Sequence, residues 1–421
     1  MALLNPEEGN RHLALPAPLF RLFQEVETGT MNPLALQRAV KNIRAKQLTP
    51  SVCRHIDPPV NFEVSCMAID EVEDRYLLCG YADGSLALLD VEERPSPAHH
   101  KFECVIQKER SQGHNFAVTG VSWYPNDTGL FVSGGFDKAV KAWDTNRAEV
   151  AFTFPMPDKV HCVQMPAVAH RHNLIAVGSA DRRVYLCDLA SGGSQHALSG
   201  HSEAVNCVAW SDQEFVLASG GMDGTLRIWD IRRTASWLAM LSYDEGPRIR
   251  KRRRPEDGQE GAGVGPTAHE GGVSALMFSP DGRHLLSSGV DAKLRLWNPR
   301  TFELQLVNFG SFHQSATRAY KKVQIAVEWD SNIVYHPRGN YVIGCDIASG
   351  QRVTTLRGHL DTVKCVVAQP RRETLLSAGK DSNILVWTPP QTGFGPRAGE
   401  DDATAGLGQG QADEDAWSDG E

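Results

Sequence analysis

The chain has 421 residues, of which 41% are apolar and 22% charged, a composition typical of globular proteins with a sizeable core. Its formal charge is −8, but eight acidic residues lie in 398–421, a stretch without Lys or Arg. The other 43 acidic residues equal the 43 Lys and Arg residues in number. The rest of the chain is therefore neutral and lacks the broad basic surface of a protein that grips duplex DNA.

The nine cysteines include no C-x-x-C pair, and no metal site or cofactor is expected. Their odd number, without a secretion signal, favours a reducing cytosolic or nuclear compartment. No run of about 18 apolar residues could span a bilayer, so no membrane role is expected. Five cysteines alternate with apolar neighbours and are predicted to be buried thiols: Cys66, Cys79, Cys187, Cys207 and Cys365.

The N-terminal segment 1–48 is predicted to be a helix-loop-helix. Residues 15–27 hold a short apolar cluster, and Asn32-Pro33 is a good start for a second helix, with an Asn cap and Pro in the first turn. Leu36, Val40 and Ile43 then recur at helical spacing and form one apolar stripe. The stripe either packs on the rest of the chain or docks into the groove of a partner.

Four segments of the chain repeat the same polar residues at the same spacing. Each has a His, an Asp 22 or 23 residues later, a Ser four residues before that Asp, and a Trp six residues after it. The four quartets are His114, Ser133, Asp137, Trp143; His201, Ser219, Asp223, Trp229; His269, Ser287, Asp291, Trp297; and His359, Ser377, Asp381, Trp387.

Three partial repeats complete the series. Asp83 and Asp181 each precede an apolar residue and an Asp by the same spacing, and 332–350 keeps the strand rhythm with Gly339 in place of the Asp. Seven units of about 40 residues, running from Gly-His to Trp-Asp, carry the WD40 signature of four-stranded propeller blades. The fold class predicted for 49–390 is therefore all-β, a seven-bladed WD40 β-propeller.

Closure of the ring is also predicted from the sequence. Pro389 and Pro390 follow Trp387, and proline cannot continue a central strand. The last blade is therefore expected to lack its outer strand, and the extended stretch 49–56 is the natural donor of that strand. Pairing of the two ends would remove the exposed strand edges.

A Ser, a His and an Asp together could indicate a hydrolytic triad. Here the same trio recurs four times at constant spacing, and no chain needs four identical active sites. The better interpretation is a buried hydrogen-bond network in each blade, in which the Asp accepts from the His, the Ser relays, and the Trp indole finds a partner. No catalytic residue is predicted.

A polar, Gly-rich insertion at 245–266 separates the fourth and fifth repeats and is predicted to be an exposed loop. It carries a basic cluster, which is read as a solvated loop, a nuclear import signal, or, less favoured, a contact with nucleic-acid backbone. The cluster consists of Arg248, Arg250, Lys251, Arg252, Arg253 and Arg254.

The Gly- and Asp-rich tail 391–421 is predicted to be disordered. Trp417 stands alone among acidic residues there, either by chance or as a short motif that folds on a partner.

Among the four complete repeats, only one continues as Trp229-Asp230-Ile231-Arg232. This W-D-x-R form resembles the docking signature of the substrate receptors of cullin 4 ubiquitin ligases. The wider chain resembles the Cockayne syndrome A family of such receptors, on the stretches 121–145, 174–192, 284–298 and 375–387. The acidic end around Trp417 is similar too.

The resemblance implies a non-catalytic receptor subunit of a cullin 4 RING ubiquitin ligase, acting in the nucleus in transcription-coupled nucleotide excision repair. It implies docking to the adaptor, damage-specific DNA-binding protein 1, through Arg232, Asp230 and the helical stripe of Leu36, Val40 and Ile43. The opposite ring face would bind the Cockayne syndrome B ATPase and the stalled RNA polymerase II assembly, without sequence-specific contact to nucleic acid.

Two alternatives stay open. A WD40 scaffold without a ligase could bind peptides or histone tails on a ring face. A propeller enzyme would need an isolated acid–base or metal cluster in the channel, and the sequence offers no candidate at metal-ligand spacing.

Overall fold

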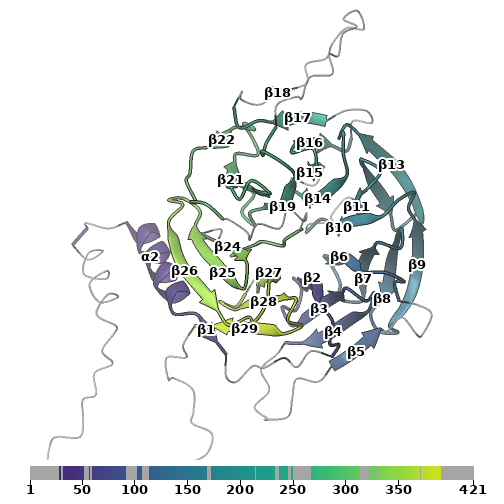
Figure 1. Cartoon of the computed structure of the whole chain (residues 1–421), viewed down its shortest axis with the longest axis horizontal. Helices are drawn as coiled ribbons and strands as arrows, with labels where there is room; N and C mark the ends of the chain where they lie inside the picture. Colours follow the sequence, from purple (N-terminus) through teal and green to yellow (C-terminus); the bar gives the residue numbers. More distant parts are fainter. Residues whose placement is uncertain are drawn as a thin grey trace, which may run out of the picture. The chain divides into compact units, whose positions relative to one another are not determined.

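A computed structural model describes most of the region between residues 28 and 389, and this region holds one helix and seven sheets (Figure 1). The described residues are 28–29, 32–51, 56, 59–91, 102–106, 113–167, 172–213, 215–232, 237–244, 248–249, 267–312, 322–328, 330, 332–369 and 371–389.

Seven antiparallel sheets surround a central axis, which confirms the predicted seven-bladed propeller (Figure 1). Blade 1 is β2 (Val64–Ile69), β3 (Tyr76–Tyr81), β4 (Leu86–Asp90) and β5 (Phe102–Ile106). Blade 2 is β6 (Val118–Trp123), β7 (Leu130–Gly135), β8 (Ala139–Asp144) and β9 (Glu149–Pro155). Blade 3 is β10 (Val160–Gln164), β11 (Leu174–Ser179), β12 (Arg183–Asp188) and β13 (Gly193–Ser199).

The remaining blades follow the same order from the axis outward. Blade 4 is β14 (Val205–Trp210), β15 (Val216–Gly221), β16 (Leu226–Asp230), β17 (Trp237–Leu241) and β18 (Arg248–Ile249). Blade 5 is β19 (Val273–Phe278), β20 (Leu285–Gly289), β21 (Leu294–Trp297) and β22 (Leu304–Gln305). Blade 6 is β23 (Ala326–Val327), β24 (Ile333–Arg338), β25 (Tyr341–Asp346) and β26 (Arg352–Arg357), and blade 7 is β27 (Val363–Ala368), β28 (Leu375–Gly379), β29 (Ile384–Thr388) and β1 (Thr49–Pro50).

Most residues of the inner strands are buried because each blade packs against neighbours on both sides. All six residues of β14 are buried, as are all six of β11, so the alternation of a one-sided sheet is lost. The core therefore lies between blades, where apolar clusters join side chains of adjacent sheets.

Strand β1 closes the ring as the sequence predicts. It pairs antiparallel with β29, with Thr49 opposite Thr388. Ser51 N–H donates to the Val386 carbonyl at 2.8 Å, and the buried Ile56 bridges to Ile384. The outer strand of the last blade thus comes from the start of the chain.

The two faces of the ring carry different turns. We call the face with the turns between the first and second strands of each blade, and between the third and fourth, the lower face. The upper face carries the turns between the second and third strands and the links between blades.

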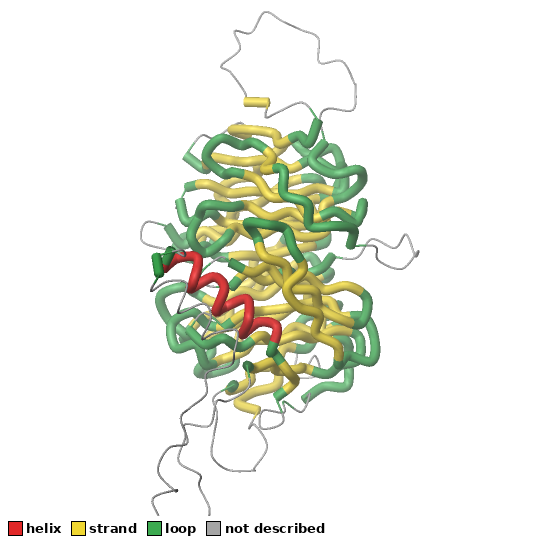
Figure 2. Tube along the Cα trace, turned by 90° about the vertical axis from the view of Figure 1, so that its left-hand side faces the viewer, coloured by secondary structure: helices red, strands yellow, loops and turns green. Residues whose placement is uncertain are grey.

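Helix α2 (Pro33–Lys46) packs beside blades 6 and 7 (Figure 2). Lys41 forms an ion pair with Asp330, and Arg44 Nη1 contacts Glu373 at 2.7 Å. Ala45, which is buried, joins the apolar cluster of these blades. No helix in the described part of the chain is long and apolar enough to cross a membrane.

One prediction needs correction. The insertion 245–266 is not a loop throughout, because β18 adds a fifth strand to blade 4 by pairing with β17. An outer strand leaves one row of backbone groups open, and β18 takes up part of that edge. The rest of the insertion lies outside the described residues, as do the apolar cluster 15–27 and the tail 391–421.

Candidate functional site

The repeated polar quartets come together inside four blades. In blade 4, Trp229 Nε1–H donates to Ser219 Oγ at 2.8 Å, and Ser219 Oγ lies 2.7 Å from His201 Nε2. His201 Nδ1 lies 3.2 Å from the Asp223 carboxylate. Both the Ser219 hydroxyl and the Trp229 ring are fully enclosed.

The direction of each hydrogen bond in this quartet follows from the donors available. The indole can only donate, so Ser219 accepts from Trp229 and gives its own proton to His201 Nε2. His201 must then carry its proton on Nδ1 and donate it to Asp223. Burial lowers the pKa of His201 despite the opposing effect of Asp223, so the imidazole is neutral.

The carboxylate at the end of this relay is well satisfied. Burial alone would raise the pKa of Asp223, but hydrogen bonds from His201, the Ser202 N–H and Thr225 outweigh it and hold the pKa below its usual range. Asp223 lies in the turn between β15 and β16, and Ser202 lies in the link from blade 3. The quartet therefore ties two loops of the upper face together.

The other three quartets have the same geometry. The distance from His Nε2 to Ser Oγ is 2.7 Å in each of them, for the pairs His114–Ser133, His269–Ser287 and His359–Ser377. The Trp indole nitrogen lies 2.7 Å from the same oxygen for Trp143 and Trp387 and 2.8 Å for Trp297. The His–Asp distances are 2.9 Å to Asp137, 2.9 Å to Asp291 and 2.8 Å to Asp381. Four enclosed copies at equivalent places are internal supports of the blades.

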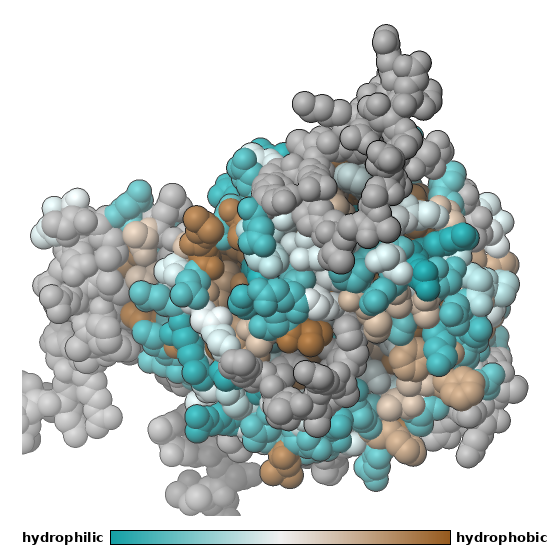
Figure 3. Space-filling view, turned by 45° about the horizontal axis from the view of Figure 1, so that its top comes forward, coloured by the Kyte–Doolittle hydropathy of each residue, from teal (hydrophilic) through white to brown (hydrophobic). Residues whose placement is uncertain are grey.

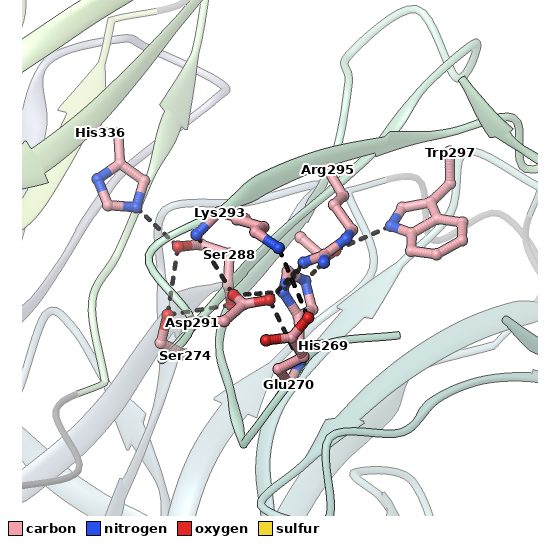
Figure 4. A network of polar contacts seen from close by, with 10 residues as sticks. His269, Glu270, Ser274, Ser288, Asp291, Lys293, Arg295, Trp297 and His336 are labelled. Carbon is pink, nitrogen blue, oxygen red and sulfur yellow. Dashed lines mark hydrogen bonds and ion pairs between the residues drawn. The ribbon is translucent and has the colours of Figure 1, made fainter. Parts of the chain in front are cut away.

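The quartet of blade 5 contains an additional residue that the sequence analysis did not single out (Figure 4). The buried Arg295 Nη1 lies 2.6 Å from His269 Nδ1 and 2.7 Å from the Asp291 carboxylate. Its guanidinium also lies over the Tyr243 ring, 4.9 Å from the centroid. The signal in the sequence is a basic residue two positions before the Trp, which recurs as Lys141 and Arg227.

A second polar chain links blades 5 and 6 (Figure 4). Ser274 Oγ–H donates toward Ser288, and Ser288 Oγ lies 2.8 Å from His336 Nε2. The His336 side chain is only 2% exposed. Burial lowers the pKa of His336 to about 4.

This histidine predicts a loss of stability in acid. In the unfolded chain His336 titrates near the usual pKa of about 6.5, whereas in the fold it stays neutral down to a pKa of about 4. The unfolded state therefore binds the extra proton, and the free energy of unfolding falls by about 3 kcal/mol between pH 7 and pH 4 from this group. In a His336→Gln variant, the fall in the free energy of unfolding between pH 7 and pH 4, measured by urea titration, should be about 3 kcal/mol smaller than in wild type. An unchanged pH profile would contradict this assignment.

The predicted adaptor-docking arginine lies on the lower face. Arg232 follows β16, and its Nε and Nη2 donate to the two Asp230 oxygens at 2.9 and 2.8 Å. The arginine side chain is 62% exposed, whereas Asp230 is 6% exposed. Asp230, also predicted to dock, is mostly covered and orients Arg232 through these two bonds, and its part in docking stays a prediction.

Two aromatic residues near Arg232 were missed by the sequence analysis. The guanidinium carbon lies over the Phe215 ring, 5.0 Å from its centroid, and the His172 ring lies 5.7 Å from that of Phe215. Both residues come from turns of blades 3 and 4 on the lower face. Neither has periodic spacing, so no pattern indicated them.

Helix α2 contacts the same lower face. Asp330 and Glu373, its ion-pair partners, lie in first turns of blades 6 and 7. At 100° per residue, Leu36, Val40 and Ile43 lie on the opposite side of the helix from Lys41 and Ala45. The three are half-buried, and none belongs to the apolar cluster that holds Ala45. The structure thus brings α2 and Arg232 to one face without contact between them.

The channel contains no metal-ligand arrangement in the described part of the chain, where no three His, Cys, Asp or Glu side chains group suitably. Seven described cysteines are buried free thiols, including the five predicted. Burial raises the pKa of Cys66 to about 12 and that of Cys345 to about 11, so both are protonated at neutral pH.

Two side chains cross the channel. Gln324 Nε2–H donates to the Met67 carbonyl at 2.7 Å, and the Met67 N–H returns a bond of 3.2 Å to Gln324 Oε1. Lys322 Nζ donates to the carbonyls of Thr119 and His161 at 2.8 and 2.9 Å. The segment that enters blade 6 is thereby joined to blade 1 by Gln324 and to blades 2 and 3 by Lys322.

The structure describes little of the remaining predicted residues, the basic cluster and Trp417. Arg248 contributes backbone to β18, while Arg250, Lys251, Arg252, Arg253 and Arg254 lie outside the described residues, as does Trp417.

Seven sheets, four of which contain this network, define a WD40-type β-propeller. The family model of the WD domain, G-beta repeat, matches residues 106–144, 192–230, 265–298 and 350–388, which contain the four quartet aspartates and tryptophans. The chain belongs to the WD40 repeat family, and within it to the group that includes WD repeat-containing protein ATCSA-1 of Arabidopsis thaliana.

The similarity to ATCSA-1 extends over nearly the whole chain. The two are 32% identical over 431 aligned residues, covering 88% of this chain and 95% of ATCSA-1. Radiation-sensitive protein 28 of Saccharomyces cerevisiae is 28% identical, over 50% of this chain and 44% of its own length. WD repeat-containing protein srw1 of Schizosaccharomyces pombe is 24% identical, over 67% of this chain and 46% of its own length.

Proposed function

We propose that this protein is the substrate-recognition subunit of a cullin 4 RING ubiquitin ligase, held by damage-specific DNA-binding protein 1 and acting in the nucleus. Its process would be transcription-coupled nucleotide excision repair, with the Cockayne syndrome B ATPase and the stalled RNA polymerase II assembly as partners. The likeness to ATCSA-1 and to Radiation-sensitive protein 28 supports a role in DNA repair.

The observation that carries the adaptor proposal is the presentation of Arg232. Asp230 holds the guanidinium through two bonds and Phe215 supports its face, so the side chain loses little freedom on binding while most of it stays accessible. The lower face also carries α2, whose apolar stripe lies on the other side of the helix from the ring-facing Lys41 and Ala45. An anchored arginine and an apolar helix surface on the same face of the ring suit a protein interface.

The mechanism requires no bond chemistry from this chain. The adaptor would hold the lower face, and the upper face would hold the substrate assembly. Such a receptor accelerates ubiquitin transfer by raising the effective concentration of the target near the ligase.

Arg232→Glu is expected to weaken adaptor binding about 30-fold, which corresponds to about 2 kcal/mol for a central interface arginine. The matched control is Arg147→Glu, at the equivalent turn of blade 2, where the arginine lies 4.0 Å from Asp144. Affinities are measured by surface plasmon resonance with purified adaptor.

The helix is tested separately by changing Leu36, Val40 and Ile43 together to serine, which spares the ring-facing Lys41 and Ala45. Combined with Arg232→Glu, this change should abolish co-purification of the adaptor and cullin. Full retention of the adaptor by the combined variant would overturn the proposal.

A second candidate is a scaffold that binds peptides or histone tails without a ligase. The exposed apolar side chains of the upper face, such as Phe116 and Leu360, favour peptide binding of some kind. Affinity purification separates the two functions, since a pure scaffold would recover partners without any cullin.

A further inference from the structure

Exposed apolar side chains concentrate on the upper face. Of the eight large apolar residues that are exposed in the described part of the chain, six lie on upper-face turns and links: Phe62, Phe116, Phe136, Val290, Leu306 and Leu360. In the space-filling view, brown apolar atoms interrupt the polar surface close to the middle of the ring (Figure 3). Single exposed apolar residues are common on protein surfaces, so only those that lie together can form a contact with another molecule.

Two of these residues, Phe116 and Phe136, lie on neighbouring upper-face loops of blade 2. Phe116 is 63% exposed and Phe136 is 37% exposed. The Phe136 N–H donates to the Ala117 carbonyl at 3.1 Å, which holds the two rings on neighbouring loops. Phe136 also meets the His161 ring edge-on, with centroids 5.6 Å apart.

Positive charge lies beside these rings. Lys159 Nζ lies 6.0 Å from the centroid of Phe136, and Lys322 reaches the His161 carbonyl at 2.9 Å. Burial and the charge of Lys322 lower the pKa of His161, so this imidazole is neutral and the lysines carry the charge. We call Phe116, Phe136, Lys159, His161 and Lys322 the mouth site.

The carboxylate nearest to the mouth site along the chain already has an ion-pair partner. Asp158, the nearest carboxylate along the chain, lies 3.2 Å from Lys138. Lys322 makes no ion pair with a carboxylate among the described residues, and its two carbonyl partners accept two of its three N–H donors. An ammonium group at the channel mouth without a carboxylate favours an anionic ligand.

We propose that the mouth site binds an acidic segment of a partner polypeptide, with a carboxylate near Lys322 and Lys159 and an apolar side chain on Phe116 and Phe136. A carboxylate accepts charge-assisted hydrogen bonds from ammonium groups, and an aromatic or aliphatic neighbour packs on the two rings. Nucleic acid fits less well, because it needs a row of cations along its backbone, and here the carboxylate of Asp158 lies between Lys138 and Lys159.

The mouth site lies on the face opposite Arg232 and α2. It therefore does not depend on the proposed adaptor docking, and a chain held by its lower face would still offer it. Val290, on blade 5, lies apart from the mouth site and gives a region for controls.

The test uses the full chain and a phage library of random 12-residue peptides. Selection on the wild-type protein should enrich sequences that combine Asp or Glu with an aromatic or aliphatic residue, and selection on Phe136→Ala should not. Enrichment of neutral or basic sequences, or no enrichment over the input library, would overturn the proposal.

A double-mutant cycle then distinguishes a binding role of Lys322 from a role as a tie across the channel. Changing the acidic residues of a selected peptide to Asn or Gln should weaken binding to wild type at least tenfold, but hardly change binding to Lys322→Met. The matched control, Lys293→Met on blade 5, should behave as wild type. Equal peptide effects on all three proteins would show that Lys322 only holds the ring.

Two further readouts complete the experiment. Circular dichroism must show that Lys322→Met is folded, and Lys322→Arg, which keeps the charge, gives a second variant if it is not. Lys322→Met should bind the adaptor as tightly as wild type does. A failure of the mouth-site proposal can therefore be told apart from a failure of the ligase proposal. Stronger binding of a fluorescent single-stranded 12-mer DNA than of the peptide would favour nucleic acid and contradict the proposal.

Discussion

Ser219→Ala is expected to lower the free energy of unfolding by about 3 kcal/mol, the result of leaving two buried groups without partners. The hydroxyl receives the Trp229 indole proton at 2.8 Å and meets His201 Nε2 at 2.7 Å. Alanine removes both bonds, and neither water nor another side chain can replace them in so enclosed a place. Urea unfolding followed by tryptophan fluorescence measures the change.

The matched control for this variant is Ser202→Ala. Ser202 Oγ also reaches Asp223, at 3.3 Å, but this serine is exposed. Water can satisfy Asp223 there, so the expected loss is below about 0.5 kcal/mol. Equal losses for the two serines would argue against a supporting role for the quartets.

Removal of residues 1–56 is expected to destabilise the ring far more than removal of residues 1–46. Both truncations delete α2, but only the longer one deletes β1 and Ile56. Burial of an isoleucine contributes about 2–5 kcal/mol, and the lost backbone bonds to β29 add to it. We therefore expect a difference of at least about 4 kcal/mol in the free energy of unfolding.

The longer truncation should also associate with itself. With β1 absent, β29 presents an unpaired edge to solvent, and such edges pair with other chains. Size-exclusion chromatography should show oligomers of the 1–56 deletion and monomers of the 1–46 deletion. Equal stability and size for the two proteins would mean that β1 does not seal the ring.

The propeller could be predicted because its signals are local to each blade. His, Ser, Asp and Trp of one quartet lie within about 30 residues, and their hydrogen bonds do not depend on how the blades are arranged. The prolines after Trp387 likewise indicated the missing strand. Repetition then gave the number of blades, and the structure confirms seven.

Contacts across the ring could not be predicted. Lys322 meets Thr119 and His161 only because the curvature of the whole ring brings blades 2 and 3 opposite the entry to blade 6. The same holds for Gln324 and Met67, which are 257 residues apart. No residue spacing in the sequence predicts these contacts across the ring.

The orientation of helix α2 on the ring could not be predicted either. Its apolar stripe suggests that Leu36, Val40 and Ile43 face the ring, yet α2 is held there by Lys41, Arg44 and the small Ala45. Hydrophobic periodicity finds the apolar side of a helix but not the surface that it meets. Docking of the stripe on an adaptor stays a prediction.

Ring closure by β1 also sets the order of events during synthesis. This strand leaves the ribosome before any blade, whereas its partner β29 leaves after all of them. At ordinary translation speeds the interval is on the order of a minute, during which the growing chain keeps open strand edges that pair readily with other chains. We expect newly made protein to need chaperone protection until the last blade emerges and captures the waiting first strand.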